Sequence, residues 1–227
     1  MKIEEEKLNN PVWYSLSEEH YKLSLEYHGI KFYQSEYCPF GGFIDHKTPK
    51  EGINKYSLLT DNFYVVGDKP ILTDKVQLKK ELVCNQMLLN QEIDFGISEL
   101  IIELKTTKQK NDLFGLVNLV QPGYFKSKTS NLGNYYGIYK NDKLVAVTGE
   151  RMKMDKYTEI SAVVTHPEHT GNAYAKQLIK HTANKIFKEN KIPYLHVAES
   201  NTGAIKLYEK LGFLTRRKIN FWNLIKK

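Results

Sequence analysis

The chain has 227 residues, enough for one large domain or two small ones. Hydrophobic residues make up 41% of it, and its 15 Tyr and 10 Phe offer ample surface to bury, which excludes an intrinsically disordered chain. The formal net charge is +7, but the basic residues are scattered without an aromatic-interleaved stripe, so we expect no nucleic-acid partner.

The sequence also limits where the protein acts. No stretch approaches the roughly 20 apolar residues that span a bilayer, so we expect no membrane partner. The acidic start, Met1 to Glu6, lacks the apolar core of a signal peptide, which predicts a cytoplasmic protein. Cys38 and Cys84 have no Cys or His partners at ligand spacing, so we expect two buried free thiols and no metal.

Residues 1–92 are aromatic and turn-rich, and their patterns are irregular. We expect a helix from about Leu16, capped by Ser15 or Ser17, and a second helix from Thr48-Pro49 to Leu59. Turns are predicted at 39–42 and 67–70, and strands at 62–66 and 79–89.

From residue 97 onward the patterns become regular. They predict, in chain order, a strand at 98–104, a helix capped by Thr107 and ended by Pro122-Gly123, a hairpin of 135–139 with 144–152, a strand at 158–165, a helix at 173–190, a strand at 194–198, a helix after Asn201, and one or two strands at 213–225. This order indicates an α/β (α+β) fold with a mixed sheet flanked by helices.

One segment has the pattern of an anion site. A strand ending at Thr165 leads through a Pro-containing loop and small residues into a helix. The first N–H groups of a helix have no intrahelical partner and carry the positive end of its dipole. Gly171, Ala173 and Ala175 leave that backbone accessible, which predicts a pyrophosphate site.

A second segment, Asn201 to Phe213, is an amphipathic helix. Asn201 is a suitable N-cap, and Gly212 a suitable stop. Ala204, Leu207, Tyr208 and Leu211 form its inward stripe. Taken alone, Tyr208 is most simply a core aromatic residue.

Together the two segments resemble the GNAT acyltransferases. The first is similar to their acyl-CoA pyrophosphate loop, and the second to their helix with Asn, Ala, Leu-Tyr and Leu-Gly-Phe. Residues 132–163 and the start Asn10-Pro11-Val12-Trp13 further resemble a two-part bacterial branch. That resemblance implies a degenerate GNAT-like subdomain over 1–92 and a catalytic domain over 93–227.

The resemblance implies acetyl-CoA as co-substrate and a set of residues that contact it: Val163, Val164, Thr165, Thr170, Gly171, Asn172, Ala173, Tyr174, Ala175, Asn201 and Tyr208. Two positions depart from the family pattern. Thr170 stands where Arg or Gln is usual, and Ala173 where Gly is commonest. We expect weaker phosphate binding from the missing guanidinium, by about 1–3 kcal/mol.

The resemblance further implies direct acyl transfer, with Tyr208 as the general acid that protonates the leaving thiolate. The backbone N–H groups of 162–165 are placed to stabilise the oxyanion. Glu159 and Glu150 are the candidate bases, each with a pKa raised by burial, and His196 is a third. Strand alternation puts Glu159 on one face with Ser161, Val163 and Thr165.

The expected function is transfer of an acetyl or short acyl group to a primary amine on a small molecule or a protein. Two alternatives stay open: a longer-acyl or amino-acid-conjugating transferase, and a non-catalytic acyl-CoA sensor. A monomer and a homodimer are both compatible with the sequence.

Overall fold

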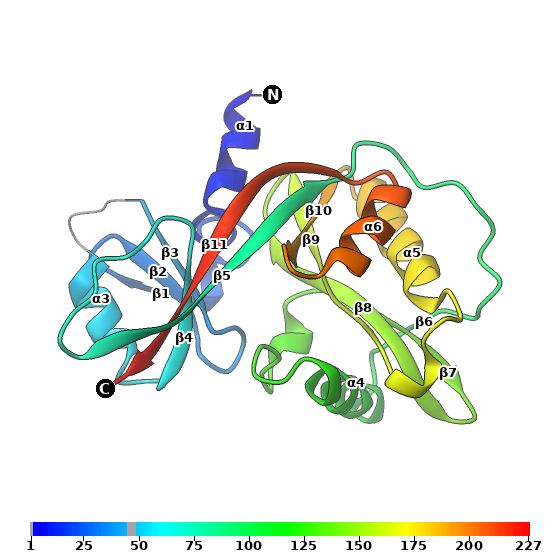
Figure 1. The fold of residues 1–227 in the computed structure, drawn as a ribbon, viewed down its shortest axis with the longest axis horizontal. Helices are drawn as coiled ribbons and strands as arrows, with labels where there is room; N and C mark the ends of the chain where they lie inside the picture. The colour runs from blue at the N-terminus through cyan, green and yellow to red at the C-terminus, as the bar shows by residue number, and fades with distance from the viewer. Residues whose placement is uncertain (1, 45–48) are drawn as a thin grey trace.

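The structure is a computed structural model that describes residues 2–44 and 49–227. The described residues form one mixed sheet of 11 strands in the order β1-β2-β3-β4-β11-β5-β10-β9-β8-β7-β6 (Figure 1). The strands are β1 Ser24–Tyr27, β2 Ile30–Tyr33, β3 Phe40–Phe43, β4 Asn62–Val66, β5 Val76–Leu88, β6 Ile102–Glu103, β7 Tyr135–Lys140, β8 Lys143–Lys153, β9 Tyr157–Thr165, β10 Ile192–Ala198 and β11 Leu214–Lys226.

Helices flank this sheet. The α-helices are α1 Lys2–Glu6, α2 Pro11–Ser15, α3 Pro49–Tyr56, α4 Thr107–Val120, α5 Tyr174–Lys188 and α6 Thr202–Lys210, and the 3₁₀ turns are η1 Lys7–Asn9, η2 Tyr21–Leu23, η3 Thr129–Asn131 and η4 Pro167–His169. The order predicted after residue 97, strand, helix, three strands, helix, strand, helix, strand, is confirmed.

Alternation along the strands separates the two faces of the C-terminal half. Tyr135 packs with α4 residues such as Leu113, whereas its neighbour Tyr136 packs with α5 residues such as Leu178. Successive side chains of a strand point to opposite faces, so α4 and α5 cover opposite sides of the sheet. The sheet is therefore buried on both faces around β7, β8 and β9.

Two long strands join the halves of the molecule. β5 pairs antiparallel with β11 from Leu88↔Leu214 to Val76↔Lys226, and β4 continues the sheet on the far side of β11. In Figure 1 these strands run from the N-terminal strands to the C-terminal helices. Both halves thus share one sheet, and a boundary at residue 92 stays a prediction.

Two predictions in the N-terminal part are wrong. No helix starts at Leu16; instead, Leu16 is the C-cap of helix α2, which begins at Pro11. The Asn10 side chain caps the start of α2 by accepting from the Trp13 N–H at 3.3 Å. The turn expected at 39–42 is strand β3. A Cβ on Gly41 would lie 2.2 Å from the Phe32 ring, so glycine serves close packing there.

Other boundaries shift. The strand expected at 98–104 is reduced to β6, because the Ser98 and Glu99 N–H groups donate to the Gln177 side chain of α5, at 2.8 and 3.0 Å. Helix α4 is capped by Thr106 in a capping box with Gln109, rather than by Thr107. Helix α3 begins at Pro49 and ends at Tyr56; Thr48 lies outside the described residues.

Neither a membrane span nor a metal cluster is found in the described part of the chain. Among residues 2–44 and 49–227, none of the helices combines the length and apolarity needed to cross a bilayer. Within the same ranges, no group of three or more His, Cys, Asp or Glu side chains is placed to hold a metal ion.

Candidate functional site

Strands β9 and β10 part in the middle of the sheet. They pair in parallel from Ile192↔Tyr157 to Tyr194↔Glu159, and no pairing is found beyond that point. β10 stays with β5 as far as Ala198, while β9 stays with β8 as far as Thr165. A wedge therefore opens between two parallel strands, with the backbone edge of β9 facing it.

A β-bulge accompanies this parting. On β9, two residues lie between the pairs Ser161↔Gly149 and Val164↔Val147, whereas one residue lies between them on β8. Ala162 takes a positive φ of 50°, which is unusual for a residue with a Cβ. The predicted shared face of Glu159, Ser161, Val163 and Thr165 is wrong, because the extra residue reverses the alternation beyond Ser161: Val163 packs on the α5 and α6 side.

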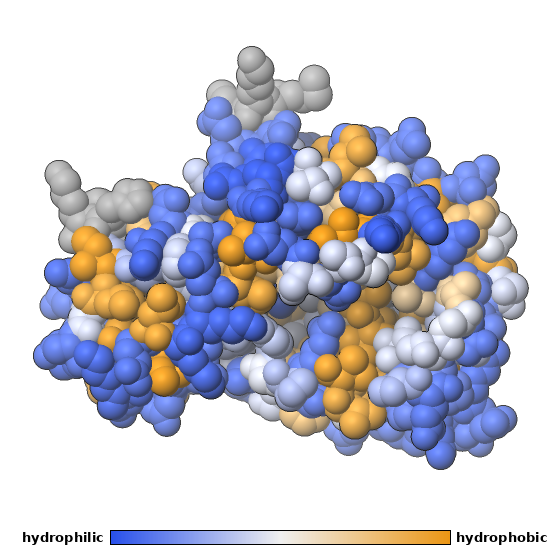
Figure 2. Space-filling view, in the orientation of Figure 1, coloured by the Kyte–Doolittle hydropathy of each residue, from blue (hydrophilic) through white to orange (hydrophobic). Residues whose placement is uncertain are grey.

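The wedge leads into a cavity of about 440 Å³. Its walls come from both halves of the chain, including Phe40, Phe221, Tyr124, Ser161 and Tyr208. Figure 2 shows the molecule hollowed between α6 and α4, with apolar side chains gathered around the hollow. The size and the mixture of aromatic and polar walls are typical of a small-molecule site.

The start of α5 is open to an anion. Ala173 is the N-cap, with φ 56°, and its side chain makes no capping hydrogen bond. Gly171 has φ 85°, and a Cβ built on it would meet no atom within 4 Å. The Asn172 amide folds the loop by donating to the carbonyl of His169 at 3.1 Å. The residues present fit a pyrophosphate bound by backbone N–H groups.

The predicted contact residues divide into two groups. Val163, Ala175, Asn201 and Tyr208 line the cavity. The remaining ones do not line it: Val164 packs toward α4, Tyr174 packs against the sheet, and Thr165, Thr170, Gly171, Asn172 and Ala173 belong to the end of β9 and the loop before α5. Only their backbone or exposed side chains are available to a ligand there.

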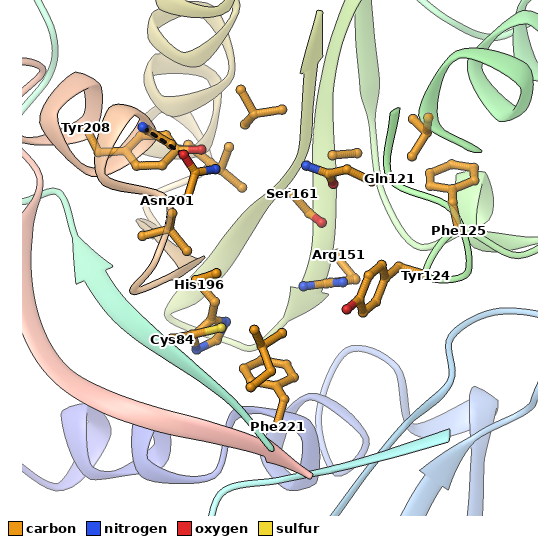
Figure 3. Close-up of a pocket in the computed structure, with 18 of the residues that line it drawn as sticks. Cys84, Gln121, Tyr124, Phe125, Arg151, Ser161, His196, Asn201, Tyr208 and Phe221 are labelled. Carbon is orange, nitrogen blue, oxygen red and sulfur yellow. Dashed lines mark hydrogen bonds between the residues drawn. The ribbon is translucent and has the colours of Figure 1, made fainter. Parts of the chain in front are cut away.

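Helix α6 carries Tyr208 into the cavity. Asn201 caps the helix by accepting from the Ala204 N–H at 3.2 Å, and Gly212 ends it with φ 92°. Tyr208 is 7% exposed, and burial raises the pKa of its phenol to about 12. The hydroxyl has no hydrogen-bond partner among the described residues, so a protonated phenol remains free to donate into the cavity (Figure 3).

Glu159 lies in a buried ion pair. The Arg151 Nε and Nη2 donate to its two carboxylate oxygens at 2.7 and 2.8 Å, and His196 Nδ1 lies 2.8 Å from Oε1. Burial alone would raise the pKa of Glu159, but the charge and hydrogen bonds of Arg151 and His196 lower it to about 2. The expectation of a raised pKa at Glu159 is therefore wrong.

The tautomer of His196 is fixed through Gln86. The Gln86 Oε1 accepts from Arg216 at 3.1 Å, and its Nε2 donates to the carbonyl of Leu8 at 2.8 Å. Arg216 can only donate and the Leu8 carbonyl can only accept, so the orientation of the Gln86 amide is fixed. Its nitrogen Nε2 therefore also donates to His196 Nε2, at 3.1 Å. Nε2 is thus an acceptor, and Nδ1 carries the proton that is donated to Glu159.

Glu150 lies away from the cavity. It is fully buried, accepts from Lys153 Nζ at 2.9 Å and from the Asn134 N–H at 3.1 Å, and packs against Gly133. It is not among the residues that line the cavity. Its assignment as a base stays a prediction without geometric support.

Sequence patterns missed the far end of the cavity. Phe40, Phe221 and Cys84 come from strands β3, β11 and β5, which are distant in sequence but lie within four successive strands of the sheet, β3-β4-β11-β5. Arg151 lies within residues 132–163, whose resemblance to the two-part branch implied no role for it. The available signal was the one guanidinium of strand β8, in the same β8–β9 hairpin as Glu159. Burial raises the pKa of the Cys84 thiol to about 12, so it is no ready nucleophile.

Comparison with known proteins finds one matching family model and similar solved structures. Residues 135–222 match the family model described as FR47-like protein. A structure from Novosphingobium aromaticivorans described as a GNAT-family acetyltransferase is 27% identical, with a TM-score of 0.86 over 97% of this chain and 98% of that one. Comparison with curated proteins gives no match.

More distant structures share the fold. A GCN5-related N-acetyltransferase from Kribbella flavida has a TM-score of 0.58 at 11% identity, over 89% of this chain and 88% of that one. A GCN5-related N-acetyltransferase-like protein from Streptococcus suis has a TM-score of 0.58 at 14% identity, over 87% and 83%. The family model and the Novosphingobium structure support the resemblance of this chain to the GNAT superfamily of N-acetyltransferases, and the fold is the GNAT fold.

Proposed function

We propose that the protein transfers an acetyl or other short acyl group from acetyl-CoA to a primary amine. The observation that carries this proposal is the wedge between β9 and β10, which opens into a cavity lined both by Ala175 of the first turn of α5 and by Tyr208. Acetyl-CoA supplies the activated acyl group as a thioester when it is bound.

Each part of the site has a role in the proposal. The N–H groups at the start of α5, near Gly171 and Ala173, hold the pyrophosphate. The unpaired edge of β9 beyond Glu159 offers N–H groups to the thioester carbonyl, where negative charge develops as the amine attacks. Tyr208 donates a hydrogen bond to the leaving sulfur.

The acidity of Tyr208 shapes that role. A phenol with a pKa of about 12 is a weaker acid than a thiol, whose ordinary value is near 8.5. Full proton transfer to a thiolate is therefore uphill, and Tyr208 acts mainly by hydrogen bonding. The attacking amine supplies the proton that the thiol finally holds.

The geometry supports no side-chain base inside the cavity. Both oxygens of Glu159 are occupied by Arg151 and His196, and both ring nitrogens of His196 are occupied as well. Glu150 pairs with Lys153 outside the cavity. We therefore propose that the amine attacks in its neutral form, after the ammonium has lost one proton to solvent. It loses the next proton through water as the amide forms.

Titration calorimetry with acetyl-CoA tests the donor site. We expect binding in the micromolar range, with desulfo-CoA, which lacks the sulfur and so also the acetyl group, binding about as well. Since the pyrophosphate site supplies the contacts to CoA, absence of binding to either compound would contradict the proposal.

A further inference from the structure

Arg151 is an unusual part of the cavity wall. Among the described residues that line the cavity, it is the one that carries a formal charge; the wall contains no Asp, Glu or Lys. Its side chain is 14% exposed, and its guanidinium lies 4.7 Å from the centre of the Phe40 ring. A cation in such a place is costly unless its donors are satisfied.

Those donors are only partly satisfied. Nε and Nη2 donate to Glu159, and Nη1 has no hydrogen-bond partner among the described residues. Glu159 has no capacity to spare for a ligand, because Arg151 and His196 occupy both of its oxygens. A ligand in the cavity thus meets a directed guanidinium donor and no available carboxylate.

The surroundings of Arg151 are aromatic and lie at the opposite end of the cavity from Tyr208. Figure 3 shows the Arg151 side chain pointing into the space beside Tyr124, with His196 and Phe221 nearby, and Tyr208 and Asn201 across the cavity with Ser161 between. A ligand that reaches from Tyr208 to Arg151 therefore passes between apolar walls.

We propose that Arg151 forms a carboxylate subsite, so that the acceptor is an amino acid with an apolar or aromatic side chain. This inference rests on the proposed function and names its substrate class. Guanidinium nitrogens match carboxylate oxygens in geometry and charge. A polyamine, by contrast, would bring a second cation to a wall that offers it no anion.

Matched acceptor pairs test this substrate class. Each amino acid is compared with the amine that lacks only its carboxylate: phenylalanine with phenethylamine, and leucine with isopentylamine, with spermidine as a third kind of acceptor. Thiol release from acetyl-CoA is measured for each. We expect a KM lower by about 10- to 100-fold for the amino acid of each pair, the scale of a charge-assisted hydrogen bond. Equal KM values, or a preference for spermidine, would overturn the proposal.

Variants of the ion pair connect the preference to Arg151. Arg151→Lys keeps the charge and loses the planar donors, and Arg151→Gln combined with Glu159→Gln removes both charges together. Arg217→Gln, at an exposed arginine outside the cavity, is the matched control. We expect both pocket variants to lose most of the preference in KM and the control to keep it. Retention of the preference in the double variant would overturn the proposal, and thermal unfolding shows that each variant is folded.

Direct binding separates this inference from the proposed function. Titration calorimetry with N-acetylphenylalanine, the expected product, needs no catalysis. Binding to the wild type that is lost in the double variant supports the carboxylate subsite, even if no thiol release is observed. In that case the proposed acetyl transfer is contradicted and the subsite is not. Equal binding to both proteins, or to neither, counts against the subsite.

Discussion

The Arg151 guanidinium and the Glu159 carboxylate form a two-point ion pair at 2.7 and 2.8 Å across neighbouring strands β8 and β9. Glu159 is 1% exposed, and Arg151 is 14% exposed because it also faces the cavity. The pair is therefore buried on the Glu159 side, while its Arg151 side faces the cavity, where we propose the carboxylate subsite. Breaking it by removing one partner leaves an uncompensated buried charge.

This pair predicts a component of acid sensitivity. Glu159 has a folded-state pKa of about 2 against an ordinary value of 4.5, so its stabilisation is present above about pH 4.5 and is lost as the pH falls toward 2. The full contribution is on the order of 3 kcal/mol. Urea unfolding of the wild type and of Glu159→Gln measures the free energy of unfolding at each pH in this range. The contribution of Glu159 is the difference between the two proteins in how steeply that free energy falls with pH.

The Glu159→Gln variant should also lower the stability of the protein at neutral pH. Glu159→Gln leaves Arg151 buried without its counter-charge, so at neutral pH we expect a loss of about 3–5 kcal/mol in the free energy of unfolding. Lys218→Gln, which breaks an exposed pair with Glu199, is the control and should change stability by under about 1 kcal/mol. Parallel pH profiles for wild type and Glu159→Gln would contradict the lowered pKa.

Tyr208→Phe tests the leaving-group interaction. Removing the hydroxyl should lower kcat by about 10²-fold or more while acetyl-CoA affinity changes little, because the hydrogen bond is made mainly to the developing thiolate. Tyr136→Phe, at a tyrosine that is equally buried but outside the cavity, is the matched control. An unchanged kcat in Tyr208→Phe would remove this residue from the mechanism.

The pH dependence of kcat/KM distinguishes a free-amine mechanism from one with a side-chain base. Without a base in the cavity, kcat/KM should rise about tenfold per pH unit up to the pKa of the amine, near 10 for an alkylamine. The measurement is a thiol-release profile from about pH 6 to 10. An inflection between pH 5 and 8 that disappears in Glu150→Gln or His196→Asn would identify a base and contradict this account.

Thr170 offers a charge series at the pyrophosphate loop. It is exposed, and its hydroxyl donates to the Pro167 carbonyl within the loop at 3.2 Å. Thr170→Arg adds a guanidinium and should tighten acetyl-CoA binding about tenfold, whereas Thr170→Glu should weaken it. Titration calorimetry at low salt measures both; equal affinities would mean that the phosphates do not lie near this loop.

Local patterns predicted the elements that local physics determines. Asn201 and Gly212 delimit α6 as expected, since capping and positive φ are properties of a few adjacent residues. The two-residue turn Asn141-Asp142 likewise joins β7 to β8, with φ of 50° and 60°. The order of elements after residue 97 follows from such signals.

What the sequence did not predict depends on contacts distant in the chain. Ala162 adopts positive φ because the sheet holds a bulge there, and no local signal marks an alanine for that conformation. Gly41 lies in a strand because it packs under Phe32. The pKa of Glu159 depends on Arg151 and His196, so burial alone gave the wrong direction.

The most direct test of the central claim is acyl transfer itself: thiol release from acetyl-CoA with an amine panel, with the product identified by mass spectrometry. We predict release that requires the amine, slows by about 10²-fold in Tyr208→Phe, and yields an acetylated amine. Tight acetyl-CoA binding without release on any amine would contradict the account and favour an acyl-CoA sensor.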